Sequence, residues 1–370
     1  MAARRFADAR SRWAGVGPYY AMFPAGFADR VVRRYTSVGG VVLDPFAGRG
    51  TSVFAAATQS RTGIGIEINP VGYVYAKAKI SPAPQAAVEA RLRTLGGMID
   101  DYGQPAAELP EFFHRCYSKR VRRFLVAARS ELDWRRNKVD RTVMGLLLVY
   151  LHGKSGAALS NQLRQTKAMS PQYAIKWWGE RGLVPPDIDP LRFMLPRVAW
   201  RYAKGTPSVH EGRVYLGDSK CTLMRVAREA PTKADLLFTS PPYHGITNYH
   251  YDQWLRLWLL GYPPNALRNG NGRRGKFEAR DEYEVLLRKV FTEASRILDA
   301  NATVYVRTDR RRFTYTTTLK VLRAVFPKKL LRVRHRPLEG QSQTRLFGAA
   351  SAPIMKSAEV DLILTAERRK

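Results

Sequence analysis

The chain has 370 residues, with 62 Lys and Arg against 31 Asp and Glu, and so carries a formal net charge of +31. This large positive charge, together with 18 Tyr and 7 Trp that can stack on bases, predicts a nucleic-acid partner rather than an anionic membrane. Two cysteines exclude a disulfide framework and a cysteine-based metal cluster, and the longest apolar run, residues 143–151, is too short to span a bilayer.

The chain begins with a basic segment. Residues 1–14 are rich in arginine and contain little that could build a core, so we expect a basic arm, either frayed or in contact with phosphates. The segment lacks the apolar core of a signal peptide, which favours a cytoplasmic protein. Aromatic residues between two prolines at 17–24 predict an ordered loop, and residues 27–35 have the apolar spacing of a helix.

A strand, a glycine turn and a helix follow. The apolar residues 41–43 predict a buried strand, and the turn after it contains Gly48 and Gly50. A second strand begins at residue 63 and ends in Glu67, where an acid is placed to accept hydrogen bonds from ribose hydroxyls. This order is typical of a nucleotide-binding α/β unit. Because no Lys-Ser or Lys-Thr follows the glycines, it favours a nucleoside ligand over a triphosphate.

Residues 71–206 form a long insertion whose apolar spacing is mostly helical. Within it, residues 153–167 are polar, basic and rich in amides. Arg, Asn and Gln are the side chains that read base edges, so this stretch is a candidate for contact with nucleic acid, with a solvated loop as the alternative. The cations expected to make this contact are Arg164 and Lys167.

Two further strands end in polar residues. Residues 214–216 precede Asp218, which is placed to accept a hydrogen bond from the amino group of an adenine ring, although a helix N-cap is the commoner explanation. Residues 235–238 precede the run Ser240-Pro241-Pro242-Tyr243. Because proline cannot continue a sheet, this strand must stop and hold a rigid loop at its carboxyl end, where open α/β sheets bind ligands.

The last third of the chain repeats the alternation of helix and strand. Helices are predicted at 249–260, 283–298 and 319–326, and strands at 303–309, 330–334 and 360–365. A flexible basic loop is expected to face phosphates through Arg268, Arg273, Arg274 and Lys276. The repeated order predicts an α/β fold with a mostly parallel sheet and helices on both faces.

The motifs D-P-F-A-G-R-G-T-S, G-D-S and T-S-P-P-Y, with Glu67, together resemble the S-adenosylmethionine-dependent DNA methyltransferases that modify exocyclic amino groups. The S-P-P-Y form is similar to the cytosine-N4 branch, whereas the adenine-N6 branch usually has Asp or Asn in the place of Ser240. The resemblance covers most of residues 15–80 and 211–365. It implies a Rossmann-like class I methyltransferase fold with S-adenosylmethionine as cofactor.

The resemblance implies a role for each matching residue. Gly48 and Gly50 form the cofactor turn, Asp44 lies near the methionine end, Glu67 holds the ribose hydroxyls, and Asp218 holds the adenine amino group. The other residues expected to touch the cofactor are Tyr20, Phe23, Pro45, Phe46, Ala47, Thr51, Ile68 and Ser219. The residues expected to hold the target base are Ser240, Pro241, Pro242 and Tyr243.

The residue types of the S-P-P-Y loop suit methyl transfer to an amino group. A base inside a duplex must be flipped out to reach a cofactor. Tyr243 offers a face for stacking, while the Ser240 hydroxyl and the Pro241 carbonyl each accept a bond from one amino hydrogen, which makes the nitrogen lone pair more available. No cysteine follows a proline, so the covalent route to cytosine carbon 5 is unsupported. We therefore predict site-specific methylation of cytosine N4 in double-stranded DNA.

Alternatives stay open at this stage. The same fold can act on adenine N6 or on an RNA base, and a catalytically silent nucleic-acid-binding protein would keep the scaffold. The catalytic domain is expected at 15–84 and 207–370, with 85–206 as a helical insertion that serves target recognition, scaffolding or dimerisation. The sequence does not decide whether a cognate restriction endonuclease accompanies the chain, or whether the chain is a monomer or a homodimer.

Overall fold

The computed structural model describes residues 6–18, 22–229, 232–244, 249–264, 280–335 and 359–366. The chain divides into two compact units. Unit 1 consists of Met1–Tyr19, Lys77–Ser208 and Tyr249–Asn271, and unit 2 of Tyr20–Ala76, Val209–Asn248 and Gly272–Lys370. Within the described residues, no helix is both long enough and apolar enough to cross a bilayer.

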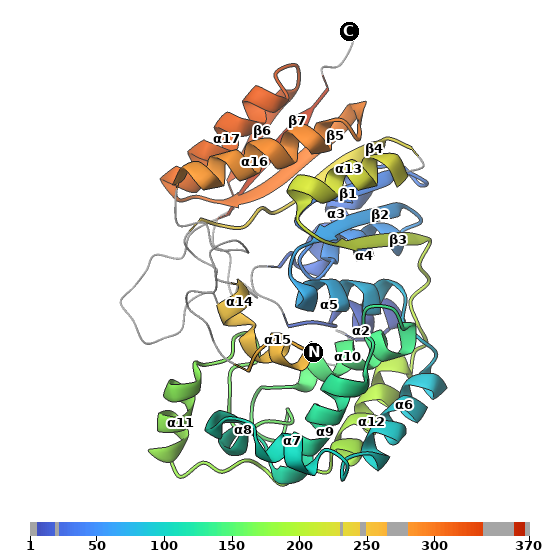
Figure 1. Cartoon of the computed structure of the whole chain (residues 1–370). Coiled ribbons are helices and arrows are strands. Elements are labelled where there is room, and N and C mark those ends of the chain that lie inside the picture. The colour runs from blue at the N-terminus through green and yellow to red at the C-terminus, as the bar shows by residue number, and fades with distance from the viewer. Residues whose placement is uncertain are drawn as a thin grey trace. The chain divides into compact units, whose positions relative to one another are not determined.

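Unit 2 is built on a seven-stranded sheet with the strand order β3-β2-β1-β4-β5-β7-β6 (Figure 1). Strands β1 to β5 pair in parallel, and β7 runs antiparallel to β5 and β6. The predicted α/β fold with a mostly parallel, Rossmann-like sheet is therefore confirmed. The strands are β1 (Val41–Asp44), β2 (Thr62–Glu67), β3 (Glu211–Leu216), β4 (Ala234–Thr239), β5 (Leu298–Asp309), β6 (Leu330–His335) and β7 (Glu359–Thr365).

Helices cover both faces of this sheet, because consecutive strand residues point to opposite sides. In β1, Val41 and Leu43 pack into one hydrophobic core, and Val42 packs into the other. The first core is shared with α13 (Ser219–Glu229), α16 (Arg280–Ser295) and α17 (Arg312–Val325). The second is shared with α3 (Ala25–Tyr35) and α4 (Thr51–Ala57). The central strands are thus buried on both faces, which explains their continuous apolar runs.

The glycines of β2 allow a helix to approach the sheet closely. Ile64 and Ile66 point into the first core, while Gly63 and Gly65 lie on the opposite face. A Cβ atom added to Gly63 would lie 2.6 Å from the main-chain oxygen of Val53 in α4. This close packing places α4, and the turn before it, directly against the sheet.

Unit 1 is built from helices. They are α2 (Ala9–Ala14), α6 (Gln85–Gly97), α7 (Gly103–Ala107), α8 (Glu111–Cys116), α9 (Lys119–Glu131), α10 (Lys138–Tyr150), α11 (Pro171–Gly179), α12 (Pro190–Tyr202), α14 (Tyr249–Asp252) and α15 (Trp254–Leu259). Helix α5 (Pro70–Ile80) has residues in both units. The helical pattern expected for the central part of the chain is therefore present.

Residues 9–14 do not form the predicted basic arm. They form helix α2, whose N-terminus is capped by the Asp8 carboxylate, which accepts a hydrogen bond from Ser11 N at 2.6 Å. The Trp13 side chain is fully buried, with its ring centroid 5.0 Å from that of Tyr202 in α12. One large aromatic side chain thus fixes a segment that its arginines made look exposed.

The helix predicted at 249–260 is interrupted at Gln253. Its backbone angles are not helical, φ −111° and ψ 12°, and its side chain donates a hydrogen bond to the Thr166 carbonyl at 3.3 Å. Two short helices, α14 and α15, result. Both belong to unit 1, whereas the sequence placed these residues in the catalytic domain.

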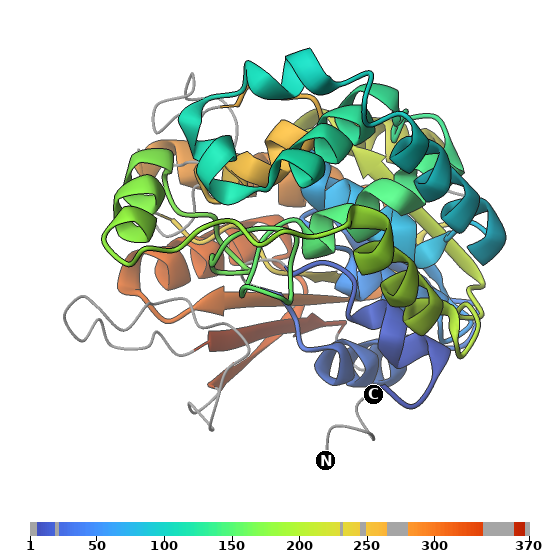
Figure 2. The ribbon, with the colours of Figure 1, turned by 90° about the horizontal axis from the view of Figure 1, so that it is seen from below.

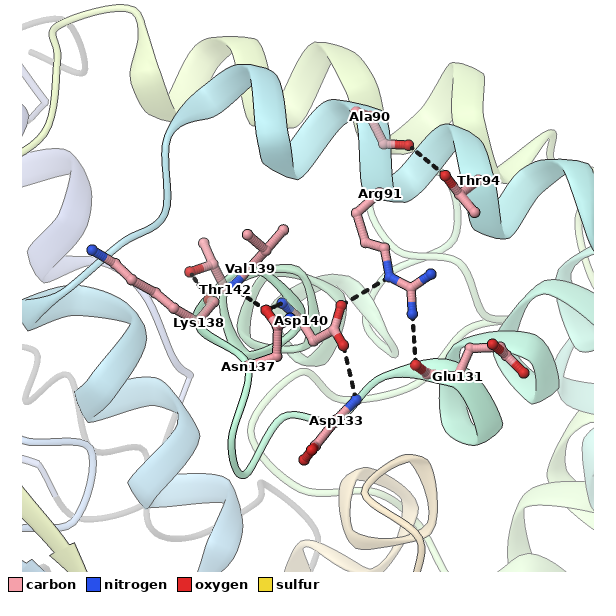
Figure 3. A network of polar contacts seen from close by, with 10 residues as sticks. All are labelled: Ala90, Arg91, Thr94, Glu131, Asp133, Asn137, Lys138, Val139, Asp140 and Thr142. Carbon is pink, nitrogen blue, oxygen red and sulfur yellow. Dashed lines mark hydrogen bonds and ion pairs between the residues drawn. The ribbon is translucent and has the colours of Figure 1, made fainter.

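A buried ion pair joins three segments of unit 1 (Figure 3). Arg91 in α6 donates to the Asp140 carboxylate in α10 at 2.8 Å and to the Glu131 carbonyl at the end of α9 at 2.6 Å. The second Asp140 oxygen accepts a bond from Asp133 N at 3.0 Å. The Asp140 side chain is 8% exposed and that of Arg91 is 24% exposed, so both charges depend on these bonds.

Replacing Asp140 by Ala is expected to lower the free energy of unfolding by about 3 kcal/mol, because the variant leaves the Arg91 charge largely buried without its partner. A urea titration followed by circular dichroism measures this change. The control is Arg93→Ala, which breaks the exposed pair with Glu89 and should cost less than about 0.5 kcal/mol. Equal losses in the two variants would contradict the stabilising role of Asp140.

Candidate active site

The candidate site lies at the carboxyl ends of four neighbouring strands of unit 2. In the sheet, β2 and β3 lie on one side of β1, and β4 and β5 lie on the other side. The strand order reverses between β1 and β4, and open α/β sheets bind ligands at such a switch point. The glycine turn follows β1, Glu67 ends β2, Asp218 follows β3, and Ser240 follows β4. The predicted cofactor and base-holding motifs therefore share one edge of the sheet.

Asp44 connects the end of β1 to the end of β4. One carboxylate oxygen accepts hydrogen bonds from Thr239 Oγ1 at 2.6 Å and from Phe46 N at 3.0 Å. The other oxygen accepts a bond from the Ser52 hydroxyl at the start of α4. Burial raises the pKa of Asp44 to about 6, although all three hydrogen bonds act to lower it. In this structure Asp44 bonds to the protein itself, so its predicted place near the methionine end stays a prediction.

Glu67 holds the glycine turn against the end of β2. Its two carboxylate oxygens accept separate bonds from Gly48 N and Asn69 N, each at 2.7 Å. Burial raises the pKa of Glu67 to about 7, and the negative charge of Asp44 adds to the increase. Each oxygen keeps a lone pair that can accept a further bond, as binding of ribose hydroxyls would require.

The glycine turn has a conformation that excludes other residues. Gly50, at the N-terminus of α4, has φ +72°, and a Cβ atom there would lie 2.6 Å from the Cβ atom of Ala76. Beside the turn, the Thr51 hydroxyl and the Asn69 amide nitrogen are buried without a hydrogen-bond partner among the described residues. Two unpartnered polar groups around a buried carboxylate fit a ligand that has hydroxyl and amino groups.

Asp218 and Ser219 make protein contacts in this structure. The Asp218 carboxylate accepts a bond from Lys220 N at 2.9 Å and pairs with the Lys220 ammonium at 3.3 Å, so it caps α13. The Ser219 hydroxyl donates to the Pro45 carbonyl in the glycine turn. The common N-cap role is therefore present at Asp218, whose side chain is 35% exposed and can accept another bond.

The S-P-P-Y loop leaves the sheet directly after β4. Ser240 is half-buried, Pro241 is buried, Pro242 is half-buried, and Tyr243 is 7% exposed. The Ser240 hydroxyl lies 3.4 Å from the Tyr243 hydroxyl, longer than an ordinary O–H···O bond. Burial raises the pKa of Tyr243 well above its usual range, so the phenol stays protonated.

A charged network extends from Tyr243 into the sheet. The Tyr243 hydroxyl lies 3.5 Å from a carboxylate oxygen of Glu359, the first residue of β7. Arg307 in β5 pairs with Glu359 at 3.2 Å and with the fully buried Asp361 at 2.7 Å. Asp361 also accepts a bond from the Tyr305 hydroxyl at 2.6 Å. The loop is thus supported by residues distant in the sequence.

The other predicted site residues lie in different surroundings. Pro45 and Ala47 are buried in the turn, and Phe46 and Ile68 are half-buried at the strand ends. Phe23 is buried and stacks on Phe238 of β4, with ring centroids 4.5 Å apart, so its ring belongs to the core. Residues outside the described parts of the chain are Tyr20, Arg268, Arg273, Arg274 and Lys276.

The sequence did not assign a role to several residues of this site. Ser52 and Thr239 are the last and first residues of two recognised motifs, and membership in these motifs was a usable signal for their contacts with Asp44. Asn69 stands two residues after Glu67, and a polar residue so close to a strand end could have been predicted as a ligand contact, as Glu67 was. Arg307 and Glu359 carried no local signal.

Comparison with known proteins adds independent support for the first part of the site. Residues 5–77 match the family model described as DNA methylase. This segment contains the glycine turn and Glu67 but not the S-P-P-Y loop. The match supports a methyltransferase, and its methyl donor is S-adenosylmethionine, which the unpartnered groups beside Glu67 fit.

Two curated proteins share short stretches with the chain. The Type II methyltransferase M.ScaI of Streptomyces caespitosus is 44% identical over 48 residues, which is 13% of this chain and 16% of that protein. The Type II methyltransferase M.MjaII of Methanocaldococcus jannaschii is 30% identical over 66 residues, 18% of this chain and 12% of that protein. The chain therefore matches only a small part of the length of each relative.

Similar solved structures include TrmN from Thermus thermophilus, with 11% identity and a TM-score of 0.37 over 97% of this chain and 52% of that one. The rRNA methyltransferase aviRa from Streptomyces viridochromogenes has 15% identity and a TM-score of 0.35, covering 96% and 92%. Scores this low add nothing to what the strand order already shows.

Proposed function

We propose that the chain is a DNA methyltransferase that transfers a methyl group from S-adenosylmethionine to the exocyclic N4 amino group of cytosine at specific sites. One observation carries the proposal. The Asp44 carboxylate joins the glycine turn after β1 to the end of β4, so this turn, which Glu67 holds from the end of β2, and Ser240 lie at adjoining strand ends. The family match to a DNA methylase supports the same reaction type.

When bound, the cofactor supplies a methyl group on a positively charged sulfur. Glu67 would accept bonds from its ribose hydroxyls, Asp218 would accept from its adenine amino group, and the Thr51 hydroxyl would find the partner it lacks. The buried carboxylates also provide negative charge near a cationic ligand. The Glu67 and Asp218 carboxylates are fixed by hydrogen bonds within unit 2, so binding requires little reorganisation of these two groups.

Ser240 and Pro241 would orient the target amino group. The Ser240 hydroxyl oxygen and the Pro241 carbonyl can each accept one amino hydrogen, which directs the nitrogen lone pair toward the methyl group. Placement of two reactants is the main requirement of such an in-line transfer. The serine favours cytosine N4, because proteins of the adenine-N6 branch usually have Asp or Asn in the place of Ser240.

Contacts with DNA would come from basic residues outside the cofactor site. We propose this role for Arg164 and Lys167 in unit 1, and for Arg268, Arg273, Arg274 and Lys276, which lie outside the described residues. Lys167 pairs with the buried Asp252 at 2.6 Å, so its charge also serves unit 1 itself. The relatives that share short stretches with the chain are Type II methyltransferases, and we also propose that a cognate restriction endonuclease accompanies this chain.

Tritium transfer from labelled S-adenosylmethionine to duplex DNA tests the proposal directly. We expect incorporation into double-stranded DNA, and nucleoside mass spectrometry of the product should reveal N4-methylcytosine. N6-methyladenine would move the proposal to the adenine branch, and incorporation into RNA alone would move it to RNA bases. Absence of label in either nucleic acid, with the cofactor still bound, would contradict an enzymatic role.

A further inference from the structure

A long irregular segment joins α10 to α11 in unit 1. Residues 151–170 contain neither helix nor strand, apart from one isolated bridge between Gly153 and Gln162 (Figure 2). Connections of this length without secondary structure are uncommon in compact units and usually serve a function.

The inner side of the segment is fixed by buried side chains. Main-chain carbonyls along it accept hydrogen bonds from His152, Trp178, Gln253, Trp254 and Arg256. The pairs are Gln162 O with Trp178 Nε1 at 2.8 Å, Arg164 O with His152 Nδ1 at 2.8 Å, Gln165 O with an Arg256 Nη atom, Thr166 O with Gln253 Nε2 at 3.3 Å and Met169 O with Trp254 Nε1 at 3.1 Å.

The donors are themselves held rigidly. His152, Gln253 and Arg256 are completely buried, and Trp178 and Trp254 are nearly so. Arg256 also donates to the Leu148 carbonyl at 3.0 Å and to the Gln253 side-chain oxygen at 2.7 Å. A buried hydrogen-bond framework of this kind fixes a backbone conformation that differs from a helix or a strand. It requires several polar groups to be buried, which is unfavourable unless each of them is hydrogen-bonded.

The outer side of the segment presents exposed basic and amide side chains. Lys154, Arg164 and Gln165 are exposed, and their side chains form no hydrogen bond or ion pair with the part of the chain that the structure describes. The Gln162 side chain instead bonds within the segment, accepting from Ser155 N at 2.9 Å. The segment therefore combines a rigid backbone with a free basic and amide edge.

We propose that this edge, formed by Lys154, Arg164 and Gln165, is a duplex DNA contact surface that takes part in choosing the methylated site. The choice of DNA rests on the proposed function. A lysine supplies a phosphate contact, whereas arginine and glutamine form paired hydrogen bonds with the major-groove edges of guanine and adenine. A backbone that is fixed before binding favours sequence choice, because misplaced partners cannot be accommodated.

Alanine variants of the exposed residues test the surface without disturbing the fold. Arg164→Ala and Gln165→Ala should each lower methylation at the preferred site about 5- to 150-fold, the range for one paired base contact, and should relax the site preference seen by modified-base sequencing. Lys154→Ala should reduce the slope of log Kd against log salt for a random 30-bp duplex by about one. The matched control is Arg93→Ala, which removes one exposed positive charge from α6.

Trp254→Phe tests the framework, because it keeps an aromatic ring in the core and removes the indole N–H that donates to the Met169 carbonyl, together with the volume of the second ring. We expect faster amide exchange at residues 162–169 and a relaxed site preference, with unchanged affinity for S-adenosylmethionine. If this variant unfolds, the exposed variants alone decide the inference.

Each result has a defined meaning. If Arg164→Ala and Gln165→Ala match Arg93→Ala in both binding and site preference, the inference is overturned while the proposed function stands. If the wild-type chain binds DNA without methylating it, the proposed function fails. The inference is then judged by DNA affinity alone, as the ratio of the Kd of each exposed variant to the Kd of Arg93→Ala. The inference would also be overturned if the three alanine variants lost binding to an RNA duplex while their binding to DNA stayed unchanged.

Discussion

Replacing Glu67 by Gln is expected to weaken S-adenosylmethionine binding about 10- to 150-fold, because a hydrogen bond to a charged group is worth about 1.5–3 kcal/mol. Gly48 N and Asn69 N each bond to a different carboxylate oxygen at 2.7 Å. A Gln side chain has one acceptor oxygen, so one of these buried N–H groups would face an NH₂ group. Isothermal titration calorimetry measures the loss.

Cofactor affinity should also depend on pH through Glu67. Burial raises the pKa of this carboxyl to about 7, so only about a tenth of it is ionised at pH 6. Since an ionised carboxylate accepts hydrogen bonds from ribose hydroxyls more strongly than a protonated one, binding should be up to about tenfold weaker at pH 6 than at pH 8. The dependence should largely vanish in Glu67→Gln. A profile of equal steepness in the variant would assign the titration to another group, such as Asp44.

The unliganded chain should respond to pH with the opposite sign. Because the folded-state pKa of Glu67 is raised from 4.5 to about 7, the stability linked to its proton is present below pH 4.5 and is lost as pH rises through 7. Glu67→Gln lacks this loss. Its Tm relative to the wild type should therefore increase between about pH 5 and pH 8 when no cofactor is present.

Much of unit 2 follows from local sequence signals. The apolar runs at β1, β2 and β4 predict strands because both faces of each strand are buried. Gly48 and Gly50 predict the turn because glycine adopts its positive φ angles without the steric cost of a Cβ atom. Glu67 and Ser240 were placed correctly at strand ends, since each directly follows a buried run.

The contacts that organise the site were less predictable, because they join residues far apart in the chain. Asp44 and Thr239 are 195 residues apart, and Tyr243 and Glu359 are 116 apart. No periodicity connects such pairs. A similar limit applies to Arg256, which looked like a helix residue of the catalytic domain and instead bonds to Gln165 in unit 1. Trp13 was missed for another reason. The many arginines around it indicated an exposed arm, whereas its side chain is fully buried.

Ser240→Ala is expected to lower kcat about 10²- to 10³-fold, the size of the effect when one preorganised hydrogen-bond partner of a transition state is deleted. Ser240 is half-buried, and within the described parts of the chain its hydroxyl has only the long contact of 3.4 Å to the Tyr243 hydroxyl. The substitution should therefore leave Tm and cofactor affinity nearly unchanged. Single-turnover methylation separates this effect from binding.

Two substitutions at Tyr243 divide stacking from positioning. Tyr243→Ala removes the aromatic face, and loss of stacking worth about 1–3 kcal/mol should weaken binding of the flipped base about 5- to 150-fold. Tyr243→Phe keeps the face and removes only the long contacts to Ser240 and Glu359, so its loss should be smaller. Tyr215→Phe, which removes a surface hydroxyl bonded to Glu229, is the matched control. If Tyr243→Phe were as damaging as Tyr243→Ala, the hydroxyl network from Ser240 through Glu359 to Arg307 would be the main contribution of this residue, and the base would have to be held by another surface.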